Sequence, residues 1–195
     1  MNQPLSSTDT ADSNIRHLII FGVILGATII AIRSLGRIFW CEYGGWSPWS
    51  WDIWSTHNSQ YLIDPYFFSH VLHGFLLYGA LHLCWKSGPL AWKLQIAVLI
   101  EAGWELLENL PIIINRYREN TMAQDYFGDS IANSTFDIFA CTLEFCLAGR
   151  MKVLHSAVLC LLIEIGMTFA IRDCLLLNIL MLVYPVNAIR EWQAG

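Results

Sequence analysis

The chain has few charged residues and no concentration of positive charge. Only 14% of its 195 residues are Asp, Glu, Lys or Arg, whereas soluble domains average about a quarter. The formal net charge is −5 and no cluster of Lys and Arg occurs, so nucleic acid is not an expected partner. With 55% hydrophobic residues, the composition indicates a membrane protein, and the length suits one domain.

Cysteine motifs and repeats are also missing. The six cysteines form neither a Cys-x-x-Cys pair nor a zinc-finger spacing. Most of them lie in apolar runs, where a free cysteine behaves as a small hydrophobic residue. The chain contains no internal repeat and no low-complexity stretch. The missing repeat weighs against a transporter built from two inverted halves.

Six apolar segments predict an all-α, polytopic bundle of five to six transmembrane helices. The first covers residues 18–32, and the polar residues 1–16 before it are expected to form a disordered tail. Arg16 alone makes a poor basic region and no cleavage site follows, so an uncleaved helix is favoured over a signal peptide. Residues 17–195 are thus expected to form a single transmembrane domain. The further segments are residues 66–85, 90–108, 130–149, 153–171 and 174–186.

The last of these segments is short enough to be a half-helix, because a crossing needs about 20 residues. Between the first two segments, residues 33–65 are rich in Trp, Gly and Ser. Trp prefers the membrane–water interface, since its ring is apolar and its N–H needs a partner. Ser47 and Pro48 predict the start of a short interfacial helix, and stacking of the Trp rings on a sugar is the alternative.

The basic residues give a small difference between the two membrane sides. With six crossings, one side carries six Lys and Arg residues and the other carries five. The six lie in the shorter loops, where the positive-inside rule applies best. Both termini are therefore expected inside. The Trp-rich segment and an irregular loop over 112–129, after Pro111 has ended the third helix, are expected outside.

Acidic residues inside apolar segments require an explanation. Each costs about 2.5–3.5 kcal/mol at the centre of a membrane helix on insertion scales. Such groups must be protonated, paired, bound to a cation or in contact with water. The residues are Glu101, Glu105, Asp137, Glu144 and Glu164.

Polar residues on three of the segments each fall on one helical face. Stripes of this kind face one another rather than lipid, so the sequence predicts a polar cavity. The stripes consist of His70 and His73 at i and i+3, of Glu101, Glu105 and Glu108 at i, i+4 and i+7, and of Asp129, Asn133, Asp137 and Glu144 within roughly 80°.

Three interpretations of this cavity remain open. Imidazoles and carboxylates on facing helices are a ligand set for zinc, iron or manganese, and the charge of the metal would offset that of the acids. Acid–base or proton-relay chemistry without a metal is the second interpretation. A hydrogen-bonded polar core that fixes helix register is the third.

Two arginines, Arg116 and Arg118, follow the third helix. The planar guanidinium fork suits phosphate or carboxylate. Near a lipid surface it indicates a headgroup or a lipid-linked phosphate, and an interfacial anchor is the alternative.

Four stretches of the chain, in order, resemble an uncharacterised family of bacterial inner-membrane proteins that is defined only as a domain of unknown function. They are SQYLIDPYFFSHVLHGF, ENLPIIINRYRENT, GDSIANSTFD and IRDCLLLNILML, within a match from Gly36 to Gln193. The resemblance implies a multi-pass protein of the bacterial inner membrane and supplies no activity. The family pattern falls on His57, Ser59, Gln60, Asp64, His70, His73, Glu101, Glu105, Glu108, Asn109, Arg116, Arg118, Asp129, Asn133 and Asp137.

The chain departs from this pattern at Cys174, Leu176 and Glu144, and His82 lies outside it. Glu144 and His82 are therefore not assigned to the site. A looser resemblance, in the order and character of motifs only, connects the chain to VanZ-like membrane proteins, which are linked to glycopeptide-antibiotic resistance. It points toward cell-envelope chemistry.

The leading hypothesis is a membrane-embedded hydrolase or transferase that acts on a lipid or lipid-linked cell-envelope substrate. A divalent metal such as zinc is the expected cofactor, and membrane lipids are expected partners. The alternatives are a proton-coupled transporter or channel component, for which a homo-oligomer would supply the missing half, and a structural or assembly factor of an envelope complex. The assigned residues are His70, His73 and Asp129 as metal ligands, Glu105, Glu108 and Asp137 as catalytic groups, and Arg116, Arg118, Asn109 and Asn133 as substrate-binding groups.

Overall fold

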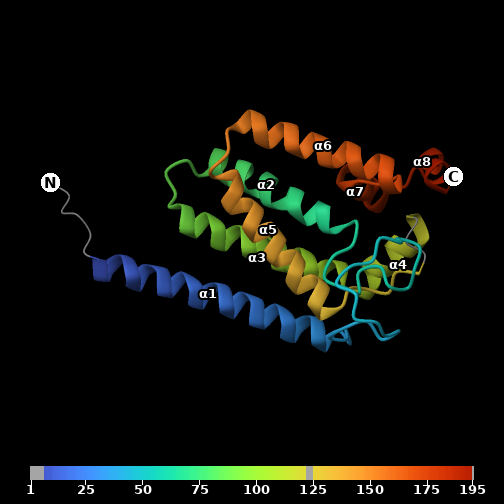
Figure 1. Cartoon of the computed structure of the whole chain (residues 1–195), viewed down its shortest axis with the longest axis horizontal. Coiled ribbons are helices and arrows are strands. Elements are labelled where there is room, and N and C mark those ends of the chain that lie inside the picture. The colour runs from blue at the N-terminus through green and yellow to red at the C-terminus, as the bar shows by residue number, and fades with distance from the viewer. Residues whose placement is uncertain (1–6, 122–124, 195) are drawn as a thin grey trace.

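The computed structural model describes residues 7–121 and 125–194. Within these ranges it contains eight helices and no strand, and one isolated β-bridge joins Trp49 to Ile63. Figure 1 shows the longer helices lying side by side along one axis. The all-α architecture expected from the sequence is confirmed.

Three helices form the centre of the bundle, namely α2 (Phe67–Cys84), α3 (Leu90–Glu108) and α5 (Ile131–Ala148). Each of them packs against the other two, and the contact between α2 and α5 is the most extensive. Apolar side chains such as Val71 and Phe75 are buried there. The same three helices carry the polar stripes, so their packing turns the stripes inward.

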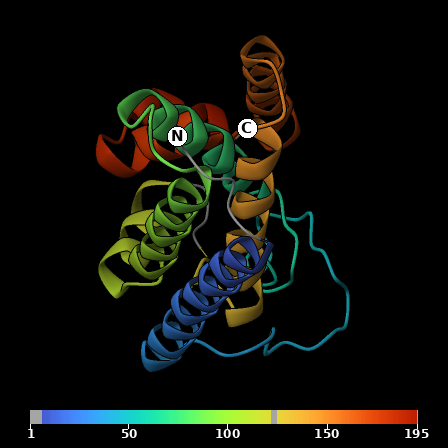
Figure 2. The same cartoon turned by 90° about the vertical axis from the view of Figure 1, so that its left-hand side faces the viewer.

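Two further long helices, α1 (Ser7–Ser34) and α6 (Val153–Ile171), lie on opposite sides of this centre (Figure 2). α1 packs on α3 and α5, whereas α6 packs chiefly on α2. Four helices, α1, α2, α5 and α6, are long and apolar enough to cross a membrane. α3 has 19 residues, but Lys93 and three glutamates lower its hydropathy. Its polar face is covered by α2 and α5 rather than by lipid.

The short helices gather at one end of the bundle, together with residues 35–66 (Figure 1). They are α4 (Pro111–Asn120), α7 (Leu175–Val183) and α8 (Asn187–Ala194). α7 has 9 residues, so its length of about 14 Å cannot cross about 30 Å of hydrocarbon. The described residues therefore contain no sixth crossing. α1 begins and α8 ends at opposite ends of the bundle, so the expectation that both termini share one side is wrong.

Two helical stretches lie where irregular structure was expected. α1 begins at Ser7, so residues 7–16 belong to a helix rather than to a disordered tail. That stretch contains no Gly or Pro that would stop the helix, and residues 1–6 lie outside the described residues. Residues 112–120, expected to be a loop, belong to α4, because Pro111 begins this helix. Proline is favoured at a first helical position, where its missing N–H is not needed.

The Trp-rich segment contains no helix among the described residues, so the short helix expected at Ser47 and Pro48 is absent. Instead, the N–H of Ile63 donates to the carbonyl of Pro48, and the N–H of Ser50 donates to the carbonyl of Ile63. These two bonds make the parallel bridge between Trp49 and Ile63, so part of the backbone of the segment is paired without a helix. Trp46 is 90% exposed and projects at the same end as the short helices.

A glycine allows α2 and α5 to approach closely. A Cβ atom added to Gly74 would lie 2.5 Å from the carbonyl oxygen of Cys141 and 2.9 Å from the backbone nitrogen of Phe145. Small residues at such crossings let membrane helices pack backbone to backbone. Gly74 therefore fixes the separation of the two helices that carry the central polar side chains.

Polar side chains hold the short helix α7 in place. The carboxylate of Glu164 accepts hydrogen bonds of 3.0 and 3.2 Å from two N–H groups in the first turn of α7. Arg116 donates to two carbonyls in its last turn, at 2.8 and 3.2 Å. The Tyr117 hydroxyl donates to Asn178 in the middle of α7, at 3.2 Å. The intramembrane acid Glu164 is thus explained as a helix cap.

Candidate functional site

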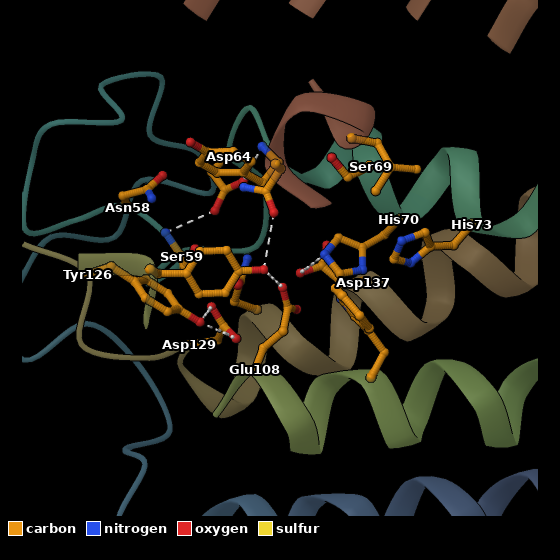
Figure 3. A pocket seen from close by; sticks show the side chains of 16 residues that line it. Asn58, Ser59, Asp64, Ser69, His70, His73, Glu108, Tyr126, Asp129 and Asp137 are labelled. Atoms are coloured by element: carbon orange, nitrogen blue, oxygen red, sulfur yellow. Dashed lines mark hydrogen bonds and ion pairs between the residues drawn. The ribbon is translucent and has the colours of Figure 1, made fainter. Parts of the chain in front are cut away.

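A polar cavity opens at the end of the bundle where the short helices lie (Figure 3). It holds about 560 Å³ of empty space, part of it open to solvent. Its walls come from α2, α3, α5, α4, α7 and the loops between them. The lining residues are Asn58, Ser59, Asp64, Tyr66, Ser69, His70, His73, Trp104, Glu108, Tyr117, Tyr126, Asp129, Asn133, Asp137, Leu175 and Asn178.

His70, on α2, is the point where the polar stripes meet. Its Nδ1 atom lies 2.7 Å from a carboxylate oxygen of Glu101 and 3.2 Å from one of Glu105. Its Nε2 atom points to the cavity and lies 3.9 Å from Asp137 (Figure 3). Glu101 also contacts Nδ1 of His73, at 3.0 Å. One imidazole therefore connects carboxyl groups of α3 and α5, as the helical spacing predicts.

Two overlapping groups of side chains have potential ligand atoms within 4.8 Å of one another: His70, His73 and Glu101, and His70, Glu105 and Glu108. Both groups combine imidazole nitrogen with carboxylate oxygen, the donor set of zinc and other transition metals. Asp129, expected as a third ligand beside His70 and His73, belongs to neither group. Glu101, which was not assigned as a ligand from the sequence, contacts both imidazoles directly, and the ligand role of Asp129 stays a prediction.

Two carboxylate oxygens in this cluster are buried and lack a hydrogen-bond partner. They are Oε1 of Glu105 and Oδ1 of Asp137. Oε1 of Glu105 lies near His70 without a hydrogen bond, because the ring nitrogen is directed at Glu101. Buried polar atoms in native proteins are almost always satisfied. These two oxygens are therefore available to accept a hydrogen bond from water or to bind a cation.

Asp129 is held in place by a reciprocal pair of hydrogen bonds with Asn109. The Asn109 amide donates to the Asp129 carboxylate at 2.9 Å, and the N–H of Asp129 donates to the Asn109 side-chain oxygen at 2.9 Å. The Tyr126 hydroxyl donates to the same carboxylate at 3.0 Å. Gly128 has φ of +100°, and a Cβ there would collide with Arg37 and Asn109. Only glycine fits this turn.

Asp64 fixes the start of α2 and one wall of the cavity. Its carboxylate accepts hydrogen bonds from the N–H groups of Tyr66, Phe67 and Ser59, at 2.7, 3.1 and 2.9 Å. Ser59 adopts a left-handed conformation with φ of 58°, which is uncommon for a residue other than glycine. The carbonyl of Ser59 in turn accepts from the N–H of Ser130 at the start of α5. The loop before α2 is therefore tied to α5.

Burial changes the acidity of the groups at the mouth of the cavity. It raises the pKa of Asp129 to about 6, against the opposing effect of the Tyr126 hydroxyl. Burial also raises the pKa of Asp64, while nearby His70 lowers it. The pKa of Tyr126 lies well above its ordinary value because the ring is buried beside Asp129. Asp129 can therefore both donate and accept a proton near neutral pH.

The structure brings only some of the predicted site residues to the cavity. The predicted metal ligands His70, His73 and Asp129 line it. Glu108, Asp137 and Asn133 line it as well. Glu105 lies behind His70, and Asn109 holds Asp129 from behind, so neither lines the cavity. Asn109 thus positions Asp129, and its substrate-binding role stays a prediction.

The two arginines also lie away from the cavity lining. Arg116 binds the carbonyls at the end of α7 instead of pointing inward, and Arg118 is likewise not a lining residue. No Lys or Arg is among the described residues that line the cavity. The phosphate site expected at these arginines therefore has no counterpart in the cavity.

Several residues that line the cavity or contact its histidines were not assigned to the site from the sequence. Glu101 stood on the same helical stripe as Glu105, and its i, i+4 spacing was the signal that could have identified it. Asp64 directly precedes Pro65 and the helix that carries His70. Tyr126, Trp104 and the Asn178 of α7 had no local signal, because the tertiary fold alone brings them to the cavity.

The opposite half of the bundle is packed with apolar side chains. Val71, Phe75, Ala140 and Ala148 form one buried cluster between α2 and α5. Val98, Ala102 and Ile138 form another between α3 and α5. The described residues thus close the cavity below the histidines, and it opens toward one end.

Comparison with known proteins places the chain in a family. Residues 32–195 match the family model DUF2585, whose description is 'protein of unknown function'. The chain belongs to this family. A UPF0314 protein of Rhizobium etli is 47% identical to it over 172 residues, 88% of each chain. A UPF0314 protein of Novosphingobium aromaticivorans is 47% identical over 180 residues, 90% of each chain.

A third member, from Rhizobium johnstonii, is 43% identical over 195 residues, which are 98% of this chain and 100% of the relative. No solved structure matches the chain. The DUF2585 match confirms the resemblance to an uncharacterised bacterial family, and the apolar helices agree with a membrane protein. The likeness to VanZ-like proteins stays a prediction.

Proposed function

We propose that the cavity is the active site of a membrane-embedded hydrolase or transferase, which binds a divalent transition metal through His70, His73 and Glu101. The observation that supports it is the meeting of two imidazoles and four carboxyl groups at the floor of an open cavity. A polar core that served only to fix helix register would need no open cavity beside it.

The substrate is proposed to be a lipid or lipid-linked molecule of the bacterial envelope, because the cavity opens at one end of a bundle of apolar helices. Glu108 is the candidate general base, since it lines the cavity and lies beside His70. It would accept the proton that water or a substrate hydroxyl loses as its oxygen attacks. Glu105 would act from behind by orienting His70.

The cavity is proposed to face the outer side of the inner membrane. The short loops at the opposite end carry Lys86, Arg150 and Lys152, and short basic loops favour the cytoplasmic side. A proton-coupled transporter is less well supported, because the apolar clusters close the far half of the bundle among the described residues.

The first experiment is the metal content of the detergent-purified, tag-free protein, measured by mass spectrometry. The test variant is His70→Ala/His73→Ala. The control is His82→Ala/His155→Ala, which removes two exposed histidines outside the cavity. We expect a near-stoichiometric transition metal in the wild type and the control, and its loss in the test variant. Absence of metal from the folded wild type would refute the metal site.

The second experiment tests the enzyme. Lipid extracts of a bacterial strain that lacks the gene are compared with the parent by mass spectrometry. We expect one class of envelope lipid to accumulate, and the wild-type gene to reverse this. His70→Ala and Glu108→Gln proteins that fold normally should fail to do so. Full reversal by both variants would exclude catalysis at this cavity.

A further inference from the structure

A second cavity lies beside the first and is almost entirely apolar. It is a groove between the start of α2, the second half of α6 and the Trp-rich segment, with about 690 Å³ of empty space, part of it open. The part of it that a water-sized molecule can occupy is about 310 Å³, at the lower end of the range of about 300–1,000 Å³ that small-molecule sites occupy. Its lining residues are Trp51, Pro65, Phe68, Ile163, Gly166, Met167, Ala170 and Ile171.

The first turn of α2 and the residues just before it separate the two cavities. Asp64, Tyr66 and Ser69 line the polar cavity, whereas Pro65 and Phe68 line the apolar groove. Neighbouring positions of one short stretch thus present a polar wall on one side and an apolar wall on the other. A molecule with a polar head and a hydrocarbon chain matches this division.

The groove stays open because α6 has small residues where it faces α2. A Cβ atom added to Gly166 would meet no atom within 4 Å. The Trp51 ring stacks on Phe68 at a centroid distance of 6.4 Å and covers the groove at its Trp-rich end. A flexible chain lying along α6 would contact Met167, which is 5% exposed, and the Phe68 ring.

The polar cavity also restricts the chemistry of the head. Its lining contains four carboxyl groups, Asp64, Glu108, Asp129 and Asp137, and no Lys or Arg among the described residues. A phosphate head would face this acidic wall, whereas hydroxyl groups can donate to carboxylates and accept from Asn58, Asn133 and the tyrosines.

We propose that the substrate is an amphiphile with an uncharged, hydroxyl-bearing head such as a sugar, which enters the polar cavity, and a hydrocarbon chain, which lies in the groove between α2 and α6. This inference rests on the proposed function and names its substrate class. Exposed tryptophans, among them Trp46, belong to the Trp-rich segment at the same end of the bundle, and their rings could stack on such a head.

The test uses the protein in phosphatidylcholine nanodiscs and two photoreactive probes. One is dodecyl glucoside with a diazirine in its chain, and the other is dodecyl phosphate with the same chain. We expect the glucoside to label the peptides of Phe68 and Met167 in a saturable manner that unlabelled dodecyl glucoside abolishes. Free glucose should compete poorly because it lacks the chain.

The test variant is Gly166→Leu, whose side chain fills the groove. The control is Gly103→Leu, at an exposed helical glycine that also has nothing within 4 Å. Labelling should fall about tenfold in the test variant, which corresponds to about 1.4 kcal/mol of lost binding, and should be unchanged in the control. Ala170→Leu fills the same groove from the next turn and serves as the second variant if Gly166→Leu does not fold.

Each of the other outcomes overturns the proposal. Equal, non-saturable labelling by both probes would show that they react from the surrounding lipid and not from a binding site in the groove. Preference for the phosphate probe would contradict the uncharged head, and labelling that survives both groove-filling variants would contradict the chain position. Photolabelling requires neither metal nor turnover, so its failure is distinguishable from failure of the metal-content and lipid-accumulation experiments.

Discussion

Replacement of Gly74 by alanine should weaken the fold and the cavity together. The added Cβ would lie 2.5 Å from the carbonyl oxygen of Cys141, whereas ordinary contact begins at 3.4 Å, so α2 and α5 must separate by about 0.9 Å, the difference of these two distances. Overpacking of this kind costs about 1–3 kcal/mol. The clashing atom belongs to the helix backbone, which cannot change rotamer to relieve the contact as a flexible side chain can.

The matched control is Gly79→Ala, on the same helix, where a Cβ meets nothing within 4 Å. Alanine is favoured over glycine in a helix by up to about 1 kcal/mol, so this variant should equal or exceed the wild type. Both glycines are helical, so this preference cancels between the two variants, and their free energies of unfolding should differ by the overpacking cost of about 1–3 kcal/mol, or roughly 2–12 °C in apparent Tm.

Tm is measured by the fluorescence of the detergent-solubilised variants, and metal content is measured on the same samples. Gly74 lies one helical turn after His70 and next to His73, so a shift of α2 should also disturb their contacts with Glu101. A Tm of Gly74→Ala that equals or exceeds the Tm of Gly79→Ala would refute the close approach of α2 and α5.

Three other variants test single contacts. Burial raises the pKa of Asp173 to about 6 from 3.8, so the folded state holds this proton more tightly than the unfolded chain. Its contribution to stability is therefore lost as the pH rises from about 4 to 6, by at most about 3 kcal/mol, and Asp173→Asn should remove that slope in unfolding measured across this range. Asn109→Leu removes the partner of the buried Asp129 N–H and one of the two partners of the Asp129 carboxylate, which keeps only the Tyr126 hydroxyl, so the free energy of unfolding should fall by about 2–4 kcal/mol in denaturant titrations. Arg116→Ala should increase hydrogen exchange in α7 while the metal content stays unchanged.

These variants have clear contrary results. A pH slope equal to that of the wild type in Asp173→Asn would show that this carboxyl is not the group responsible. Asn120→Ala, which removes a single side-chain bond in α4, is the control for Asn109→Leu, and similar losses in both would contradict the central role of Asn109. Unchanged exchange of α7 in Arg116→Ala would mean that this arginine does not hold the helix.

The helical fold and the central polar residues were predictable from the sequence because both depend on local spacing. Apolar runs of 18 residues or more define the long helices, and the i, i+4 and i, i+3 intervals place Glu101, Glu105, His70 and His73 inward. The cost of burying acids then requires these stripes to meet. Spacing could not show which carboxyl faces which imidazole, so the sequence did not reveal that Glu101 rather than Asp129 contacts both histidines.

The remaining features depend on contacts between distant segments. The sequence does not reveal that Arg116 binds carbonyls of α7, about 66 residues later, and an arginine fork suits phosphate equally well. Pro111 is compatible with the end of one helix and with the start of the next, and the sequence alone favoured the first. The apolar groove likewise arises from the separation of α6 and α2, which no local pattern encodes.

The short helix α7 shows how polar contacts can fix the position of an apolar segment in a membrane protein. An apolar run such as LLLNILMLV would have a similar free energy at many positions in the hydrocarbon, because lipid tails are as apolar as its side chains. Directional bonds from Glu164, Arg116 and Tyr117 distinguish one place from all the others. The position of α7 is thus determined mainly by these few polar residues. Conservative replacement of its apolar residues should therefore leave the position of the helix unchanged.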